Sequence, residues 1–140
     1  MRIRILLASI ALAAALSAAA DEPFRVIVNP GNAAAGISLH ELSQLFLKKK
    51  TRWPSGEVVQ PVEPGDERLR ARFAEKVHRK SLNAVKAYWN QVIFSGRDVP
   101  PVEKPSDDDV AAYVRANAGA VGYVSPLATP AGVKTLAVKD

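Results

Sequence analysis

Hydrophobic and polar positions follow two spacings along this chain, one typical of strands and one typical of helices. Residues 24–29 (FRVIVN) alternate, are β-branched, and predict a strand that ends at Pro30-Gly31. Apolar residues recur at helical spacing from residue 39 up to the break at residues 51–56. The remaining predicted strands are residues 58–62, 119–124 and 134–138, and the remaining predicted helices are residues 67–78, 82–94 and 107–117.

The predicted helices begin at residues that can cap them. Ser38 is followed three residues later by Glu41, which is the spacing of a capping box. Asp66 and Ser81 precede the next two helices, and Ser106 precedes the last one. These side chains accept hydrogen bonds from backbone N–H groups that a helix start leaves without a partner, so the boundaries are set locally.

The predicted order of elements is β-α-β-α-α-α-β-β. Strands separated by helices imply crossover connections, so we expect an α/β fold with a mixed sheet covered by helices. Pro61 places the second strand at an edge, or itself at a strand end, because proline cannot donate to a sheet ladder. Residues 99–101 are expected to be extended. The length suits one domain over residues 21–140.

The first twenty residues have the three-part layout of a secretory signal. A cationic start at residues 1–4 precedes a weakly apolar run at residues 5–16, and small residues follow at Ala18-Ala19-Ala20. The apolar run of about 12 residues is too short for a membrane span, which needs about 20. We therefore expect residues 1–20 to be a signal peptide cleaved after Ala20, and the protein to be exported to the periplasm.

Composition excludes several classes of chemistry. The chain has no Cys and only two His, which rules out a thiolate nucleophile, a disulfide scaffold and a His-rich metal centre. Loss of Arg2 and Arg4 with the signal lowers the formal net charge from +5 to +3, which is low for a nucleic-acid binder. Residues 48–50 (KKK) with Arg52 form the only basic run, and we interpret it as a solvated helix end.

The search for catalytic motifs gives negative results. His40-Glu41 begins like the H-E-x-x-H zinc motif, but Gln44 stands where the second histidine is needed. Residues 107–109 (DDD) occupy a helix start, where carboxylates favour the helix dipole, and they lack calcium-loop spacing. Trp89 lies on an apolar stripe, whereas the environment of Trp53 stays open. We expect no enzyme activity, no metal and no cofactor.

One segment is more specific than a helix followed by a turn. Residues 45–53 (LFLKKKTRW) resemble the stretch I-F-L-G-K-x-T-x-W of phosphate ABC-transporter substrate-binding proteins, with Lys49 replacing the usual glycine. The resemblance extends over residues 24–126. Three further segments resemble this group and its short, single-lobe members: residues 87–89 (AYW), 93–96 (IFSG) and 118–124 (AGAVGYV).

This resemblance implies a periplasmic-binding-protein type 2 fold, export and an association with phosphate uptake. Full-length members close two lobes on the anion, so it also implies that this chain is a single lobe. In those members an arginine and an S-G-T helix start hold phosphate after the strand that corresponds to residues 58–62. Residues 63–68 (EPGDER) stand there instead, with three carboxylates that would repel a dianion. The turn at residues 29–33 also departs from the Gly- and Ser-rich pattern of the family.

We therefore expect a non-catalytic, exported, solute-binding-protein-like domain in which the phosphate-binding motif is not retained. The candidate ligand-binding residues for an anion are Ser38, Asp66 and Arg68. The expected partners are a small anion or a transporter or sensor component, and self-association is compatible with the sequence. Nucleic acid and stable membrane insertion are not expected.

Two other functions stay open at this point. The first is a periplasmic protein-interaction or accessory module without a small-molecule ligand, whose exposed side takes the place of the second lobe. The second is a small hydrolase that uses a serine or a pair of carboxylates. The sequence disfavours the hydrolase, because no nucleophile has a general base at a recognisable spacing.

Overall fold

One sheet and four α-helices contain most of residues 22–140, which are the residues described by the computed structural model. The predicted signal peptide and its cleavage point after Ala20 lie outside the described residues. The strands are β1 (Arg25–Val28), β2 (Gly36–Ser38), β3 (Gln60–Pro64), β4 (Val102–Lys104), β5 (Ala120–Val124) and β6 (Lys134–Lys139). The helices are α2 (Leu39–Phe46), α3 (Glu67–Phe73), α4 (Leu82–Phe94) and α5 (Asp107–Ala116), and the π-helix η1 (Ala74–His78) continues α3.

Strand β1 runs against the other five strands of the sheet, whose order is β2-β6-β1-β5-β3-β4. It pairs antiparallel with both β5 and β6. The pairs β2–β6, β3–β4 and β3–β5 are all parallel. The carboxyl ends of β2 to β6 therefore share one edge of the sheet, together with the amino end of β1.

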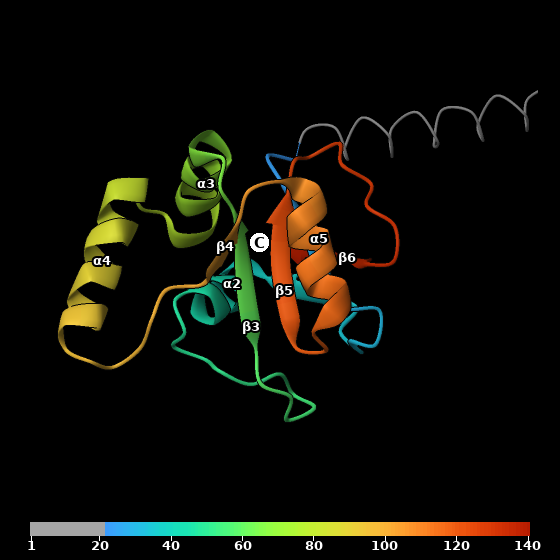
Figure 1. Ribbon diagram of the computed structural model, residues 1–140, viewed down its shortest axis with the longest axis horizontal. Helices are drawn as coiled ribbons and strands as arrows, with labels where there is room; N and C mark the ends of the chain where they lie inside the picture. The colour runs from blue at the N-terminus through green and yellow to red at the C-terminus, as the bar shows by residue number, and fades with distance from the viewer. Residues whose placement is uncertain (1–21) are drawn as a thin grey trace, which may run out of the picture.

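Helices cover both faces of the sheet, which makes the molecule three layers thick (Figure 1). In β1, Val26 and Val28 pack into the core shared with α2, α3 and η1, whereas Ile27 packs into the core shared with α5. The alternation that predicts this strand thus supplies two cores, because successive side chains point to opposite faces.

Aromatic rings fill the larger core. Phe73 at the end of α3 stacks on Tyr123 of β5 with the ring centroids 3.9 Å apart and the planes 3° from parallel. Phe24 and Phe46 each contact both of these rings. All four side chains are buried, so this cluster joins α2 and α3 to the centre of the sheet.

The expected α/β class and the predicted elements are present, and the structure adds two strands, β2 and β4. Each has only three residues. Such segments are too short to show alternation, and backbone pairing with β6 and β3 defines them as strands. The segment expected to be extended at residues 99–101 leads directly into β4.

Pro61 lies in a strand that is interior to the sheet, between β5 and β4. It pairs with Val121 of β5 on one side. On the other side the pairing of β3 with β4 begins only at Val62. The strand is therefore not at an edge of the sheet. Because β4 is short, Pro61 has no strand neighbour on the β4 side, and its missing N–H group breaks no hydrogen bond between β3 and β4.

The structure corrects which lysine after α2 stands where the phosphate-binding proteins have glycine. Lys48, not Lys49, has a positive φ, of 55°. A left-handed backbone is costly for a residue with a Cβ atom and is the usual place for glycine after a helix. Matched letter by letter, I-F-L-G-K-x-T-x-W also aligns its glycine with Lys48, so the earlier assignment to Lys49 was wrong by one residue.

Candidate functional site

The candidate residues lie at the edge of the sheet where strands β2 to β5 end, which we call the carboxyl edge. It comprises Ser38 at the end of β2, and residues 65–66, residues 105–106 and Ser125 after β3, β4 and β5. In open α/β sheets, ligands bind in the crevice outside the carboxyl ends of the strands. Three of the four helices also begin at this edge, after Ser38, Asp66 and Ser106.

The structure separates the three predicted site residues into two places. Asp66 and Arg68 lie together at the end of β3, whereas Ser38 ends β2. Three strands, β6, β1 and β5, lie between β2 and β3. At a strand spacing of about 4.8 Å the two places are about 19 Å apart, so Ser38 cannot share one small anion with Asp66 and Arg68.

The first turn of α3 is capped by its own side chain. The Oδ1 atom of Asp66 accepts hydrogen bonds from the backbone N–H of Arg68 at 2.9 Å and from that of Leu69 at 3.2 Å. These are the donors that would face an anion at a helix N-terminus. The carboxylate of Asp66 therefore engages two donors that would otherwise be free to face an anion.

The other helices are capped in the same way. At α2, the hydroxyl of Ser38 accepts from the N–H of Glu41 at 3.0 Å. At α5, the hydroxyl of Ser106 accepts from the N–H of Asp109 at 3.1 Å. The N–H of Ser125, at the end of β5, donates to Oδ1 of Asp107 at 3.2 Å. The predicted N-caps are confirmed, and each of these serines engages one first-turn N–H of its helix.

The side chain of Arg68 is exposed at the surface beside this cap. Among residues 22–140 it forms no ion pair with a carboxylate. It is thus the one predicted site residue whose charged group can meet a ligand directly. Its neighbours Asp66 and Glu67 are acidic and exposed, which lowers the attraction of this place for an anion.

A partly buried charged network lies just inside the same edge, and sequence reasoning missed it. Arg70 of α3 contacts Glu63 of β3, with Nη2 to Oε2 at 3.3 Å, and Glu103 of β4, with Nη1 to Oε2 at 3.5 Å. The hydroxyl of Tyr123 and the Nε atom of Arg70 are buried and have no hydrogen-bond partner among the described residues. The available signal was the strand alternation, which turns Glu63 toward the larger core.

Burial dominates the electrostatics of this network. It raises the pKa of Glu63, and the nearby Arg70 opposes that rise only in part. Burial also raises the pKa of Tyr123, and the charge of Glu63 adds to the effect. Both terminal nitrogens of Arg70 already face carboxylates, so this arginine is committed to holding β3, β4 and α3 together and does not present a free guanidinium.

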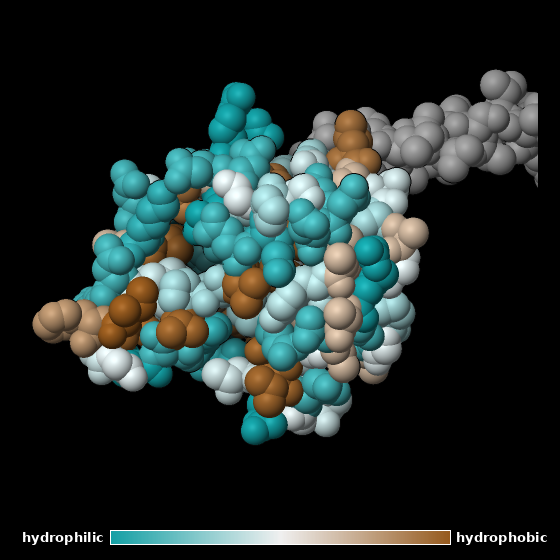
Figure 2. Space-filling model, in the orientation of Figure 1, coloured by the Kyte–Doolittle hydropathy of each residue, from teal (hydrophilic) through white to brown (hydrophobic). Residues whose placement is uncertain are grey.

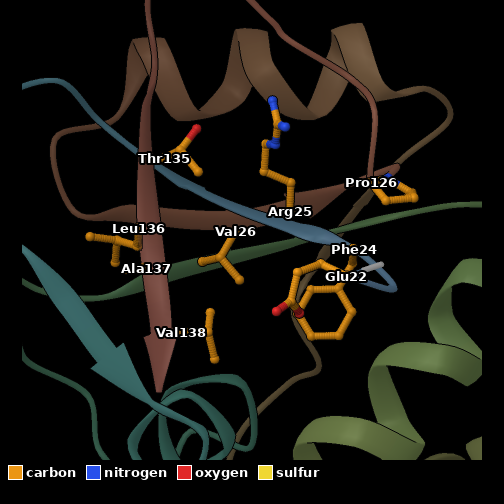
Figure 3. Close-up of a pocket in the computed structure, with 9 residues that line it drawn as sticks. All are labelled: Glu22, Phe24, Arg25, Val26, Pro126, Thr135, Leu136, Ala137 and Val138. Atoms are coloured by element: carbon orange, nitrogen blue, oxygen red, sulfur yellow. The ribbon is translucent and has the colours of Figure 1, made fainter. Parts of the chain in front are cut away.

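One surface depression has a mainly apolar lining. It measures about 590 Å³ and lies along β1 and β6 (Figure 3). Figure 3 shows Arg25 and Thr135 on one side of these strands, with Val26 and Val138 on the other. Nη1 of Arg25 donates to the carbonyl of Ala128 at 2.8 Å, so the depression offers no uncommitted cation to an anion.

Trp53, whose environment the sequence leaves open, lies in the interior, and His78 is half-buried. Trp53 is buried, and its Nε1 donates to the carbonyl of Gly119 at 2.9 Å, which makes it part of the core and not a surface platform. His78 lies against Ser43, with Ser43 Oγ and His78 Nδ1 2.7 Å apart. Burial, reinforced by Lys80 and Lys49, lowers the pKa of His78 to about 4, so this histidine is uncharged at neutral pH.

The Ser43–His78 pair does not form a catalytic arrangement. Ser43 is buried, and the shift of His78 has burial and two lysines as its causes, with no carboxylate orienting the ring. A serine nucleophile needs an exposed hydroxyl and an oriented base.

Within residues 22–140, no group of three or more His, Asp or Glu could hold a metal ion. None of the helices described is long and apolar enough to cross a membrane.

Three solved structures share the fold of this chain. A phosphate ABC transporter substrate-binding protein from Clostridium perfringens, with bound phosphate, aligns with a TM-score of 0.63 and 18% identity, over 82% of this chain and 44% of its own. The chain shares its fold. This is the periplasmic-binding-protein type 2-like fold that the sequence resemblance implies, and it confirms that expectation.

Two other structures agree. An ABC-type phosphate transport receptor from Vibrio cholerae aligns with a TM-score of 0.55 and 15% identity, over 82% of this chain and 45% of its own. A phosphate-binding protein from Planctomyces limnophilus gives 0.59 and 18%, over 84% and 41%. The chain thus spans less than half the length of each of these structures. No protein-family model and no curated protein matches the sequence.

Proposed function

We propose that this chain is a non-catalytic, exported, solute-binding-protein-like domain that does not retain the phosphate site of its structural relatives. The observation that carries this proposal is the cap of α3. Asp66 takes the backbone N–H groups of Arg68 and Leu69, which are the donors a helix N-terminus would offer to an anion. An incoming phosphate would have to displace a covalently attached carboxylate from both of them.

Electrostatics supports the same conclusion. Glu63, Asp66 and Glu67 lie within one turn of the start of α3. Arg70, the nearest buried cation, is already shared between Glu63 and Glu103. Only the exposed Arg68 remains to attract an anion, and one solvated guanidinium beside two carboxylates provides little net attraction for a dianion.

Export follows from the first twenty residues. Their cationic start, apolar run and small residues before Asp21 favour cleavage after Ala20 and a periplasmic location. The folded domain would then comprise residues 21–140. Amino-terminal sequencing of the protein recovered from a periplasmic extract should give Asp21 as the first residue, and an intact Met1 in that fraction would contradict the assignment.

Calorimetric titration with inorganic phosphate tests the central claim. We expect no saturable heat and no change of the melting temperature at phosphate concentrations that saturate a binding protein. The variant Asp66→Ser supplies a positive comparison, because it replaces the capping carboxylate by the hydroxyl found at such sites. Saturable one-to-one binding by the unmodified chain, lost in Arg68→Gln, would overturn the proposal.

A second candidate is a periplasmic interaction or accessory module without a small-molecule ligand. It is favoured by the exposed apolar residues at one end of the molecule, where Phe94 is 94% exposed. Light scattering after size exclusion shows whether the partner is a second copy of this chain. A strictly monomeric chain at all concentrations would exclude a second copy as the partner.

A further inference from the structure

Helix α4 stands apart from the sheet at the far side of the molecule from α5 (Figure 1). It is attached through a small apolar cluster in which Val85, Trp89 and Val92 pack against Ala74 of η1. Most of its other residues are exposed. A helix held in this way can present its end to a partner without disturbing the core.

The end of α4 exposes a group of large apolar side chains. Phe94 is 94% exposed, Val99 61% and Ile93 49%, and we call these three residues the α4 tip. Figure 2 shows brown apolar atoms gathered at the outer end of α4. Exposed apolar side chains that gather at one extremity mark an interaction site more often than single ones scattered over a surface.

The tip is held by a folded turn. The N–H of Arg97 donates to the carbonyl of Val92 at 3.2 Å, and that of Gly96 donates to the carbonyl of Ile93 at 3.0 Å. Gly96 has a φ of 69°, which a residue without a Cβ atom adopts at no steric cost. The chain therefore turns back at the end of the helix and places Arg97 beside the apolar residues.

Two segments near the tip contain basic residues and no acidic ones. The first segment, residues 42–56, contains Lys48, Lys49, Lys50 and Arg52. The second, residues 76–97, contains Lys76, Arg79, Lys80, Lys86 and Arg97. The acidic residues of the described chain lie outside these two segments, and Asp98 directly follows the second. The sequence shows the two segments, but only the fold shows that they meet.

The fold brings the two segments together along α4. The hydroxyl of Tyr88 donates to the carbonyl of Leu47 at 2.8 Å, and Nζ of Lys49 lies 5.7 Å from the centre of the Tyr88 ring. A hollow of about 470 Å³ between these segments is lined in part by Lys49, Tyr88 and Arg97. Asp98 also lines this hollow, where it pairs with Lys48 at 3.5 Å.

Several cations of these segments are uncommitted. Four have partners, since Lys48 pairs with Asp98, Lys50 with Glu41, Lys76 with Asp140 and Lys86 with Glu67. Within residues 22–140, no ion pair forms at the exposed side chains of Lys49, Arg52, Arg79, Lys80 and Arg97. Of these, Arg97 lies between Phe94 and Val99 in the chain, and Lys49 lines the same hollow as Arg97, so both remain available to an anionic partner.

We propose that the α4 tip docks on an anionic phospholipid surface, with Phe94, Ile93 and Val99 at the acyl boundary and Lys49 and Arg97 at the phosphates. An apolar tip flanked by cations matches the two contributions that hold a protein at a membrane interface, burial of apolar side chains and attraction to anionic headgroups. Phe94 projects almost free of contacts at the end of a helix. A protein partner would more commonly use aromatic residues within a packed patch.

Vesicle co-sedimentation tests this docking with the protein purified after export. We expect binding to vesicles of phosphatidylglycerol mixed with phosphatidylcholine, weakening as salt is added, and no binding to phosphatidylcholine alone. Phe94→Ser should lower the partition coefficient roughly tenfold. The pair Lys49→Gln with Arg97→Gln should lower it roughly 30-fold, at about 1 kcal/mol for each cation.

Matched variants show whether the effect is local. Leu127→Ser removes a 73% exposed apolar residue from the loop after β5. Lys104→Gln with Arg115→Gln removes two charges from β4 and α5. Both should retain at least half of the vesicle binding, as should the unmodified protein when free inorganic phosphate is added.

Three results would overturn the proposal. The first is a lack of binding to the anionic vesicles at low salt. The second is a loss in the matched variants as large as that in the tip variants. The third is self-association that Phe94→Ser abolishes in the absence of vesicle binding, which would assign the tip to a second copy. The proposal does not depend on whether the chain binds phosphate, so neither outcome of the calorimetric titration bears on it.

Discussion

The side-chain hydroxyl of Ser43 on α2 lies 2.7 Å from Nδ1 of His78, the last residue of η1. This contact joins two helices 35 residues apart in the chain. The ring of His78 also packs edge-on against Phe73, with the centroids 5.6 Å apart. A protonated imidazole would lack solvation there, which is why burial is the leading cause of its lowered pKa.

The first prediction is that stability falls with acid because of this histidine. The pKa of His78 is about 4 in the folded chain, against the ordinary value of 6.5. Between these values the unfolded chain binds a proton that the folded chain does not, so the free energy of unfolding decreases as pH falls through this window. At 1.36 kcal/mol per pKa unit the loss is about 3 kcal/mol, measurable by urea unfolding.

The variant His78→Gln is the control, since it keeps a polar side chain and cannot take up the proton. The difference in unfolding free energy between the two chains isolates the histidine. This matters because the raised pKa of Glu63 acts with the opposite sign, favouring the folded chain as pH falls. If the variant loses as much stability in acid as the unmodified chain, His78 is not the responsible group.

Local features of the fold were predictable, because their signals lie within a few residues. Ser38, Asp66, Ser81 and Ser106 all cap the helices that the sequence assigns to them. The β-branched run of β1 also predicts a strand, and the structure buries both of its faces. The strands β2 and β4 could not be predicted, because three residues become a strand only through pairing with a neighbour.

The candidate site was harder to predict, because its parts come from different elements. Ser38 and Asp66 look alike in sequence, as helix caps after strands, yet the sheet order places three strands between them. Glu63 meets Arg70 and Glu103 only after α3 folds over the strands. Charges brought together by topology leave no spacing in the sequence to recognise.

The second prediction is that Gly119→Ala strongly destabilises the fold. A Cβ atom at this position would lie 1.8 Å from the carbonyl oxygen of Val58. The Gly119 carbonyl also accepts hydrogen bonds from Nε1 of Trp53 and from the N–H of Gln60, both at 2.9 Å. Any shift that relieves the clash weakens these bonds, so we expect a loss of about 3 kcal/mol or more in urea unfolding.

The variant Gly31→Ala provides the comparison. Its Cβ atom would meet only Oδ1 of Asn29, at 3.3 Å, which is a side-chain atom able to move. We expect a change of less than about 1 kcal/mol. Similar losses at both positions would show that backbone entropy, and not the contact with Val58, determines the effect.

The third prediction separates Lys48 from Lys49. The left-handed backbone at Lys48 lowers the stability of the folded chain by about 1 kcal/mol, and glycine adopts this backbone without that cost. The negative φ of Lys49 gives glycine no such advantage, and its greater freedom in the unfolded chain is destabilising there. We therefore expect Lys48→Gly to be about 1 kcal/mol more stable than Lys49→Gly in urea unfolding. Equal stabilities would contradict the assignment of the left-handed position.

The fourth prediction concerns Arg70 and the buried carboxylate of Glu63. Arg70→Met keeps an apolar stem of similar length but removes the cation that faces both Glu63 and Glu103. Removing one partner of a buried pair leaves an uncompensated charge, so we expect a loss of about 3 kcal/mol at neutral pH. Because Glu63 then titrates at a still higher pKa, mild acid should restore part of the loss by protonating it.

The double variant Glu63→Gln with Arg70→Met decides whether charge is the cause. Glutamine keeps the shape of Glu63 without the charge, so the double variant should be more stable than Arg70→Met alone, and acid should no longer improve it. Urea unfolding of all four chains at neutral and mildly acidic pH gives the coupling energy. A double variant as unstable as the sum of the two single variants would show that Arg70 stabilises the edge by packing of its stem, and that Glu63 and Arg70 act independently.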